Sequence, residues 1–355
     1  MTTTSGEVRL RRRYFVCRSC GLGTHLADQW LGLEGSLSLH ALRLATLAAA
    51  SWSFDRASAL LQEFCGLRLS DDTIRTHSLE AARQVRQWQR QTPVLGEAFQ
   101  RAAGAVEFSS DGTSVNTLEG WREMRLAVFA KRVAGKPAKP AQWDSRTLPS
   151  PSCRVLFGGL WAAEQYGPQW RAWAGRLRIR QTEEITVLAD GAKWIWNQVE
   201  QNLPGAQGVL DIYHASEHLH GTAKVLFGEG GCERSAWVEA RRQTLLKGGL
   251  AALRGELQAE QDHSATAAQR SGVQELLDYL EPHEGHTGYR ERLAKGQSIG
   301  SGMIEGACKT VVGKRLKQTG ARWRVRHAEQ MTALCGVLYG DHWDAYWKSK
   351  ERETP

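Results

Sequence analysis

Short apolar runs in the middle of the chain each lead to an aspartate, and helical patterns lie between them. The three runs and the acids that follow them are residues 105–108 with Asp111, residues 185–188 with Asp190, and residues 208–210 with Asp211. Further strands are predicted at 124–130 and 155–161, with helices near Trp170 and over 194–202. This alternation predicts a mixed α/β sheet domain, and sites in such sheets are built where strands end.

Helical patterns precede and interrupt this sheet domain. From Ser38 to about Gln91 apolar residues recur at three- and four-residue steps, with a break at Gly66 and an N-cap at Ser70. A helix, a short turn and a basic helix are compatible with a helix-turn-helix DNA reader, and equally with any small helical bundle. Helical periodicity returns from 219 to about 290, which predicts an all-helical insertion.

The patterns divide the chain into six segments. They are a basic arm (1–36), a helical unit (37–100), the first part of the sheet domain (101–218), the helical insertion (219–296), the closing part of the sheet domain (297–347) and a tail (348–355). The closing part starts with a glycine-rich turn at 299–302, which opens one more helix.

That last helix carries Glu305 inside its apolar face, if successive residues turn by about 100°. Burial of an unpaired carboxylate is costly, so Glu305 needs a cation, and a salt bridge to Lys309 is one solution. The other is a cluster with Asp111 and Asp190, although Asp-Gly is also simply a good turn sequence. Carboxylate oxygens suit Mg²⁺, and two such ions serve phosphodiester chemistry.

The charge after Glu305 is one-sided. Between residues 309 and 327 there is no acid, and the basic residues are Lys309, Lys314, Arg315, Lys317, Arg322, Arg324 and Arg326. Such a run favours contact with phosphates, and Trp323 is predicted to stack on an unpaired base. The alternative is a basic surface without a partner. The whole chain carries 46 basic and 38 acidic side chains, a net charge of +8, which permits a polyanionic partner.

The basic arm contains Arg11, Arg12 and Arg13, which are predicted to contact DNA, followed by Cys17 and Cys20 in a Cys-x-x-Cys-Gly sequence. Two thiolates on such a turn are half of a tetrahedral zinc site, and His25 is the one plausible local ligand. Two interpretations stay open: a partial zinc site, or two ordinary reduced cysteines.

A second metal motif competes with the carboxylate cluster. His214, Glu217 and His218 match H-x-x-E-H, in which two histidines one helical turn apart hold the zinc of a peptidase. A downstream carboxylate would complete that site, and Glu281 and Glu284 are available. A peptidase would leave the strand-end aspartates and the basic run unexplained.

Composition excludes two classes of protein. Seven cysteines with one close pair argue against a disulfide framework and favour a reducing compartment, the cytoplasm. No apolar stretch reaches the roughly 18 residues that a membrane span requires, and no secretory signal is evident.

Taken together, these segments resemble the ISKra-type bacterial insertion-sequence transposases, a DDE group related to the mutator-type enzymes. The matching motifs are SDGT at 110–113, GWRE at 120–123, ADGAKWIWN at 189–197, LDIYHASEHL at 210–219, IGSGMIEGACK at 299–309 and RLKQTGARW at 315–323. They follow the expected order and, with their flanks, span residues 7 to about 347.

The resemblance implies an RNase H-like mixed sheet with helices on both faces. It implies a catalytic triad of Asp111, Asp190 and Glu305 that holds two Mg²⁺ ions, for which Mn²⁺ can substitute. Asp211 and His214 match an accessory pattern after the fifth strand. The implied partners are the terminal inverted repeats of a bacterial element and target DNA, acted on by a homo-oligomer near the nucleoid.

The resemblance also leads us to expect a longer N-terminus, with a further cysteine pair before the arginine-rich arm. The sequence lacks this further cysteine pair before the arm. A second function therefore stays open, namely a DNA-binding remnant without cleavage activity that represses a full-length element.

Overall fold

A five-stranded mixed sheet forms the centre of the computed structural model, which describes residues 1–31, 33–34, 36–180, 183–318 and 320–353. Its strands are β7 (Ala105–Thr117), β8 (Gly120–Arg132), β9 (Cys153–Gly159), β10 (Ile185–Ala189) and β11 (Gln207–Leu210). Their order is β11-β10-β7-β8-β9, with β7, β8 and β9 antiparallel and β10 and β11 parallel to β7. The predicted mixed α/β class is confirmed.

Strand β7 is much longer than its apolar run. It pairs with β8 over all thirteen residues, and the two form a hairpin with its tip at Leu118 and Glu119. The prediction that the strand ends at Asp111 is therefore wrong, because the polar residues after Phe108 continue the antiparallel ladder. Pairing with β10, however, stops at Phe108. Asp111 thus lies where the parallel part of the sheet ends.

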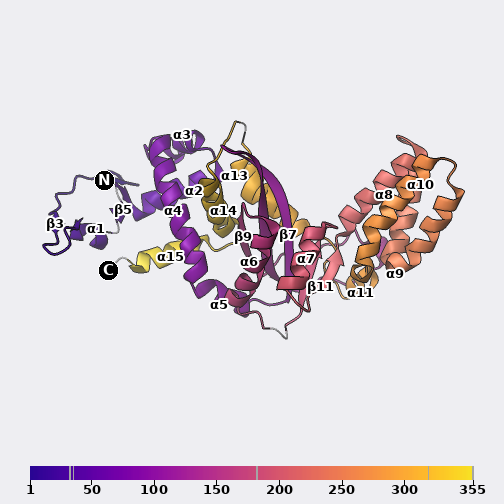
Figure 1. Cartoon of the computed structure of the whole chain (residues 1–355). Helices are drawn as coiled ribbons and strands as arrows, with labels where there is room; N and C mark the ends of the chain where they lie inside the picture. Colours follow the sequence, from indigo (N-terminus) through magenta and orange to yellow (C-terminus); the bar gives the residue numbers. More distant parts are fainter. Residues whose placement is uncertain (32, 35, 181–182, 319, 354–355) are drawn as a thin grey trace.

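The two faces of the sheet bury different partners. One face, with Phe108 and Phe129, packs against α6 (Ala163–Arg176) and α7 (Lys193–Asn202) through Trp170 and Ile195. The alternate residues, among them Leu126, pack against the C-terminal helices (Figure 1). Period-two burial on a two-faced strand produces this division.

The C-terminal helices share one core with the N-terminal helical unit. The N-terminal helices are α2 (Leu39–Ser51), α3 (Phe54–Cys65), α4 (Asp71–Gln91) and α5 (Val94–Arg101), and the C-terminal ones are α14 (Val325–Tyr339) and α15 (Trp343–Glu353). Ser70 caps α4 as predicted, since its hydroxyl accepts from the Thr73 amide at 3.2 Å. Gly66 ends α3 with φ of 62°, a left-handed conformation that favours glycine.

The predicted basic side of α4 is largely neutralised. Arg75 pairs with Asp72 at 2.6 Å, and Arg83 pairs with Glu80 at 2.5 Å, both within the helix. Arg86 instead bridges to α14. These arginines offer less free charge to a nucleic acid than the sequence pattern indicates.

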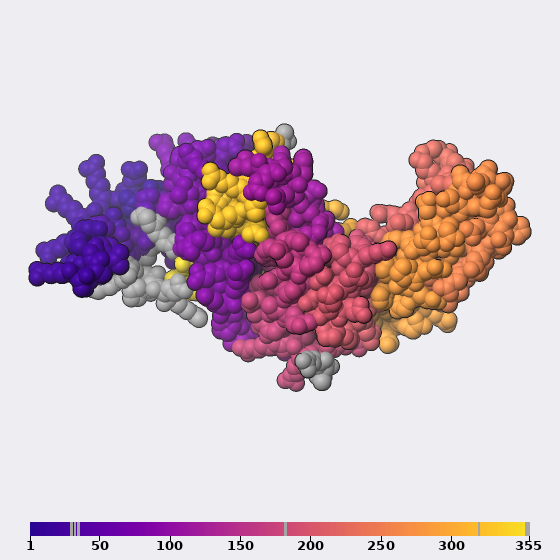
Figure 2. Space-filling view, viewed as in Figure 1, coloured from indigo at the N-terminus to yellow at the C-terminus, as the bar shows by residue number. Residues whose placement is uncertain are grey.

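The helical insertion projects from one end of the sheet, and its core continues into the sheet through Leu188, Val209 and Leu210 (Figures 1 and 2). It consists of most of α8 (Ile212–Phe227), then α9 (Cys232–His263), α10 (Ala267–Leu280), the short 3₁₀ helix η2 (Glu281–His286) and α11 (Tyr289–Ala294). A kink at Gly249, with φ of 64°, divides α9 so that its two halves pack side by side.

The arm lies at the opposite end of the molecule (Figure 1). A small sheet joins β1 (Thr2–Thr3), β2 (Gly6–Glu7), β5 (Leu33–Glu34) and β6 (Leu37–Ser38), and α1 (Leu26–Trp30) precedes β5. A separate hairpin, β3 (Phe15–Val16) with β4 (Gly23–Thr24), carries the Cys-x-x-Cys turn. Among the described residues, no helix is long and apolar enough to cross a bilayer.

Candidate active site

The strand register places Asp111, Asp190 and Asp211 at one level of the sheet. Val187 pairs with Phe108, so Asp190 and Asp111 each lie three residues beyond that pair. Ala189 pairs with Leu210, so Asp190 and Asp211 each follow directly. Neighbouring strands are about 4.8 Å apart, and residues in register on parallel strands share a face. The three carboxylates therefore belong to one edge and one face of the sheet.

Asp190 is held in a tight turn. Its carboxylate accepts from the Ala192 amide at 3.0 Å, and its carbonyl accepts from the Trp196 indole at 2.7 Å. Tyr279 of the insertion packs on the next residue, where a Cβ on Gly191 would come within 2.3 Å of the ring. Glycine at 191 is thus required by this close approach, and not only by the turn.

Asp211 is fully buried and joins two helices of the site. One carboxylate oxygen caps α8 by accepting from the amides of Tyr213 at 2.6 Å and His214 at 3.4 Å. The other accepts from the amide of Ser301 at 2.5 Å and from its hydroxyl. Because Ser301 directly precedes α12 (Gly302–Ala307), Asp211 fixes the starts of α8 and α12 relative to each other.

His214, in the first turn of α8, faces that junction. One ligand atom from each of Asp211, His214 and Glu305 lies within 4.8 Å of the others, and no other such group of three occurs in the described part of the chain. Burial opposes protonation of His214, but the charges of Asp211 and Asp190 outweigh it and raise the pKa of the imidazole. This histidine lies in a strongly negative environment.

Glu305 reaches the group from α12, which continues through a π-helical turn, Cys308–Gly313, into α13 (Lys314–Leu316). The predicted apolar face is confirmed, because Ile304, Ala307, Cys308, Val311, Val312 and Leu316 are all buried. Glu305 itself lies at the edge of that face and keeps 35% of its side chain exposed. Lys309, the alternative partner, is 3.9 Å away and mostly exposed, so it neutralises Glu305 weakly.

Asp111 lies in the middle of β7, and neither it nor Asp190 belongs to the ligand group that contains Glu305, so the described residues do not bring the predicted triad together within 4.8 Å. Its carboxylate accepts from the Gly112 amide at 2.6 Å and from the Cys308 thiol at 3.7 Å, which ties β7 to the helix of Glu305. Burial, and then the charge of Asp190, raise the pKa of Asp111. No described lysine or arginine approaches Asp111 or Asp190 within 4 Å. The two carboxylates repel each other, and the charge of His214 offsets this repulsion only in part.

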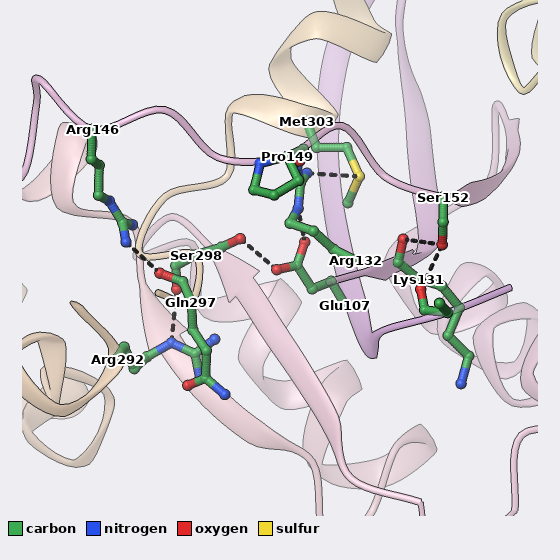
Figure 3. A network of polar contacts seen from close by, with 11 residues as sticks. Glu107, Lys131, Arg132, Arg146, Pro149, Ser152, Arg292, Gln297, Ser298 and Met303 are labelled. Atoms are coloured by element: carbon green, nitrogen blue, oxygen red, sulfur yellow. Dashed lines mark hydrogen bonds and ion pairs between the residues drawn. The ribbon is translucent and has the colours of Figure 1, made fainter. Parts of the chain in front are cut away.

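A network of buried polar contacts positions the segment that leads to Glu305 (Figure 3). Glu107, only 5% exposed on β7, accepts from the Arg132 guanidinium at 2.8 Å and from the Ser298 hydroxyl. The carbonyl of Ser298 accepts from Arg292 at 2.7 Å. The carbonyl of the preceding residue accepts from Arg146 at 2.8 Å. Residues 297–301 are therefore bound to β7, to the insertion and to the 133–152 loop before α12 begins.

The basic run of the sequence divides into exposed and buried residues. The exposed ones are Lys309, Lys314, Lys317, Arg322, Arg324 and Arg326. Arg315 is 2% exposed, donates to the Ala49 carbonyl, and lies 4.6 Å from the ring centre of Phe54 and 4.9 Å from that of Trp323. Trp323 is itself buried. The prediction that Arg315 belongs to an exposed DNA-gripping surface and the prediction that Trp323 stacks on a base are wrong, because this buried pair joins α13 to the N-terminal helices.

The arginines and cysteines of the arm are exposed, and the described residues around the cysteines do not complete a metal site. Arg11, Arg12 and Arg13 are exposed. Cys17 and Cys20 are also exposed, and hydrogen bonds, first from the Ser19 hydroxyl, lower the pKa of Cys17 to about 6. His25 contacts the Arg13 carbonyl at 3.2 Å, and neither cysteine belongs to a group of three ligands among the described residues.

The H-x-x-E-H residues do not assemble as a zinc site. His218 stacks on Tyr279, with ring centres 3.5 Å apart, and is not part of the ligand group that contains His214. Glu281 and Glu284, the candidate third ligands, both lie beside Arg254.

Three contributors to the site are indicated weakly or not at all by the sequence. Glu107 is an acid inside an apolar run, which marks it as a buried, partnered group. Ser301 lies in the glycine-rich turn, and Tyr279 carries no indication at all because it reaches the site from the insertion. No protein-family model matches the sequence, and a search of the curated proteins finds no match.

Proposed function

We propose that the chain is a metal-dependent DNA transposase, as its resemblance to the ISKra-type enzymes implies. The observation that carries the proposal is that Asp111 and Asp190 share one edge of the sheet, where the Cys308 thiol ties Asp111 to the helix of Glu305 and no described lysine or arginine lies within 4 Å of either aspartate. Carboxylates gathered in this way are costly to the fold unless a cation joins them, so they indicate a functional site.

The sheet supports an RNase H-like fold for this proposal. Three antiparallel strands come first in the chain, and two parallel strands then add beside the first of them, in the order β11-β10-β7-β8-β9. Helices cover both faces, and the acid-bearing helix α12 follows an all-helical insertion. These features support the RNase H-like fold that the family resemblance implies.

The donor set fits divalent cations with oxygen ligands. The carboxylates of Asp111, Asp190 and Glu305 would hold Mg²⁺ or Mn²⁺, and the repulsion between Asp111 and Asp190 is the feature that such an ion would relieve. A bound pair of ions supplies activation of the attacking oxygen and charge stabilisation at the leaving oxygen.

The protein's own residues orient the reacting groups. Asp211 is saturated with hydrogen bonds, so it positions His214 and Glu305 and is not free to bind substrate. In the proposal His214, whose pKa is raised, would contact a phosphate oxygen. In the proposed reaction water cleaves the phosphodiester at an element end, and the freed 3′-hydroxyl then attacks target DNA, with positioning as the main source of rate.

The decisive experiment is a cleavage assay on DNA that bears the inverted repeats flanking the coding region, with and without Mg²⁺ or Mn²⁺. Wild-type protein is expected to nick the element ends only with metal. Asp190→Ala should lower the rate at least about 100-fold, because it removes one of the groups that stabilise the transferring phosphate. Asp262→Ala, the same change at an exposed acid of α9, should leave the rate unchanged.

Other outcomes would point elsewhere. Tight binding of the repeats without any cleavage would favour the non-catalytic remnant. Stoichiometric zinc and casein cleavage, both lost in His218→Ala, would favour a peptidase and refute the transposase.

A further inference from the structure

A pocket of about 700 Å³ opens between the N-terminal helical unit and the segment after α13. The first turns of α3 and α4 form one wall, with Phe54 and Arg75. The tip of the β7–β8 hairpin, Leu118, and the residues Arg322 and Arg324 form the other. Figure 2 shows C-terminal residues, in yellow, at the surface between the N-terminal helices and the hairpin.

The charge of this pocket is predominantly positive. Arg322 and Arg324 are exposed, and no described acid lies within 4 Å of either. Burial, and then the charges of Arg326 and Arg324, lower the pKa of His327 on the same wall. The acids that line the pocket are Asp55 and Asp71, both on the N-terminal helices.

A buried guanidinium forms part of the pocket lining. Arg315 is 2% exposed, its Nε donates to the Ala49 carbonyl, and its Nη2 has no hydrogen-bond partner. Buried donors are nearly always satisfied, so an orphaned one in a positive pocket points to a ligand acceptor. The flanking rings of Phe54 and Trp323 hold this guanidinium in place.

The pocket is joined directly to the strand of the candidate active site. The Trp323 amide donates to the Asn116 carbonyl at 3.1 Å, and the Leu118 amide donates to the Trp323 carbonyl at 2.9 Å. From Asp111 to Leu118 the strand advances seven residues, or about 23 Å at roughly 3.3 Å per residue. That distance equals about seven base pairs of B-form DNA at a rise of about 3.4 Å.

We propose that this pocket binds a backbone phosphate of the DNA, about seven base pairs from the phosphate that is cleaved. The proposal rests on the proposed function and adds a second contact point, shared between the N-terminal helices and the closing part of the chain. Arg322 and Arg324 neutralise the phosphate, and the Arg315 nitrogen supplies a buried donor. A duplex held at both points would lie along β7.

The test is the salt dependence of DNA binding by the double variant R322A/R324A, measured by fluorescence anisotropy on a labelled 30-base-pair duplex and a labelled 30-nucleotide single strand. Loss of the one phosphate contact should lower the slope of log Kd against log salt by about 0.9 for a duplex and about 0.7 for a single strand. The control R101A/R290A removes two exposed arginines outside the pocket, and thermal unfolding confirms that both variants fold.

A second measurement locates the contact. Single neutral methylphosphonate linkages are placed along the cleaved strand, and affinity should fall for substitutions about seven positions from the cleavage site in wild-type protein but not in R322A/R324A. A slope equal to that of the control, with wild-type binding intact, would overturn the pocket and leave the proposed function standing. Wild-type protein that binds neither DNA would overturn both.

Discussion

Glu107 and Asp111 lie on the same face of β7, four residues apart, and have opposite environments. Glu107 is almost completely buried and is matched by Arg132 and Ser298. Asp111 is half-buried, receives one amide and one thiol, and faces the charge of Asp190. A carboxylate whose partners are all within the protein contributes to the fold, whereas one without a cation costs stability and is available to something that binds.

The largest expected change in the free energy of unfolding is at Glu107, the carboxylate that is paired with Arg132. Glu107→Gln leaves the buried Arg132 without its counter-charge and weakens the bond from Ser298, so it should lower the free energy of unfolding by about 3–5 kcal/mol. Urea unfolding at neutral pH measures this loss. Glu63→Gln, at an exposed position on α3, is the control and should change stability by less than about 0.5 kcal/mol. An equally small change for Glu107→Gln would show that the pair is not structural.

Asp211 sharpens the comparison, because it is a buried carboxylate compensated by hydrogen-bond donors and not by a cation. Asp211→Asn keeps one acceptor oxygen for the cap of α8, but it presents an amide to Ser301 in place of the second. A loss of about 1–3 kcal/mol is expected from the unmatched Ser301 donors. Urea unfolding and the cleavage assay together test this, since both stability and rate should fall. Unchanged cleavage would refute the positioning of Glu305 through Ser301.

The smallest expected change in stability is at Asp111, which has no salt-bridge partner among the described residues. Asp111→Asn removes repulsion with Asp190, so the free energy of unfolding should stay level or rise by up to about 1 kcal/mol without metal. Wild-type protein should gain about 1.4 kcal/mol at a Mg²⁺ concentration ten times its dissociation constant, and the variant should gain none. Unfolding with and without the ion measures both. Destabilisation of Asp111→Asn as large as that of Glu107→Gln would remove the contrast between the two acids.

Periodicity and the placement of acids predict much of this molecule from sequence. Strands β10 and β11 and helix α7 follow their apolar patterns closely, because short buried strands and amphipathic helices have clear periods. Glu305 lies at the edge of its helix's apolar face and not inside it, and its nearest possible ligand partners are Asp211 and His214 rather than the predicted Asp111 and Asp190. Strand β7 was predicted too short, since its second half is polar and is held by β8 and not by its own apolar side chains.

Side-chain direction was harder to predict than element type. Arg315 lies in a run of basic residues, and nothing in the run distinguishes the one guanidinium that becomes buried between two rings. A long side chain can bury its stem and stack its head on aromatic faces, so charge alone does not indicate exposure. Tyr279 could not be found either, because its position beside Asp190 depends on how the insertion folds back.

Helix α8 belongs to the candidate site at one end and to the insertion at the other (Figure 1). Its sixteen residues form a rod about 24 Å long, with no glycine or proline kink in its first two turns. A helix without a kink in this part tilts as one rigid body when the distant helices move. A partner that displaces the outer end of the insertion, such as a second DNA end or a second subunit, would therefore also displace His214 in the first turn of α8.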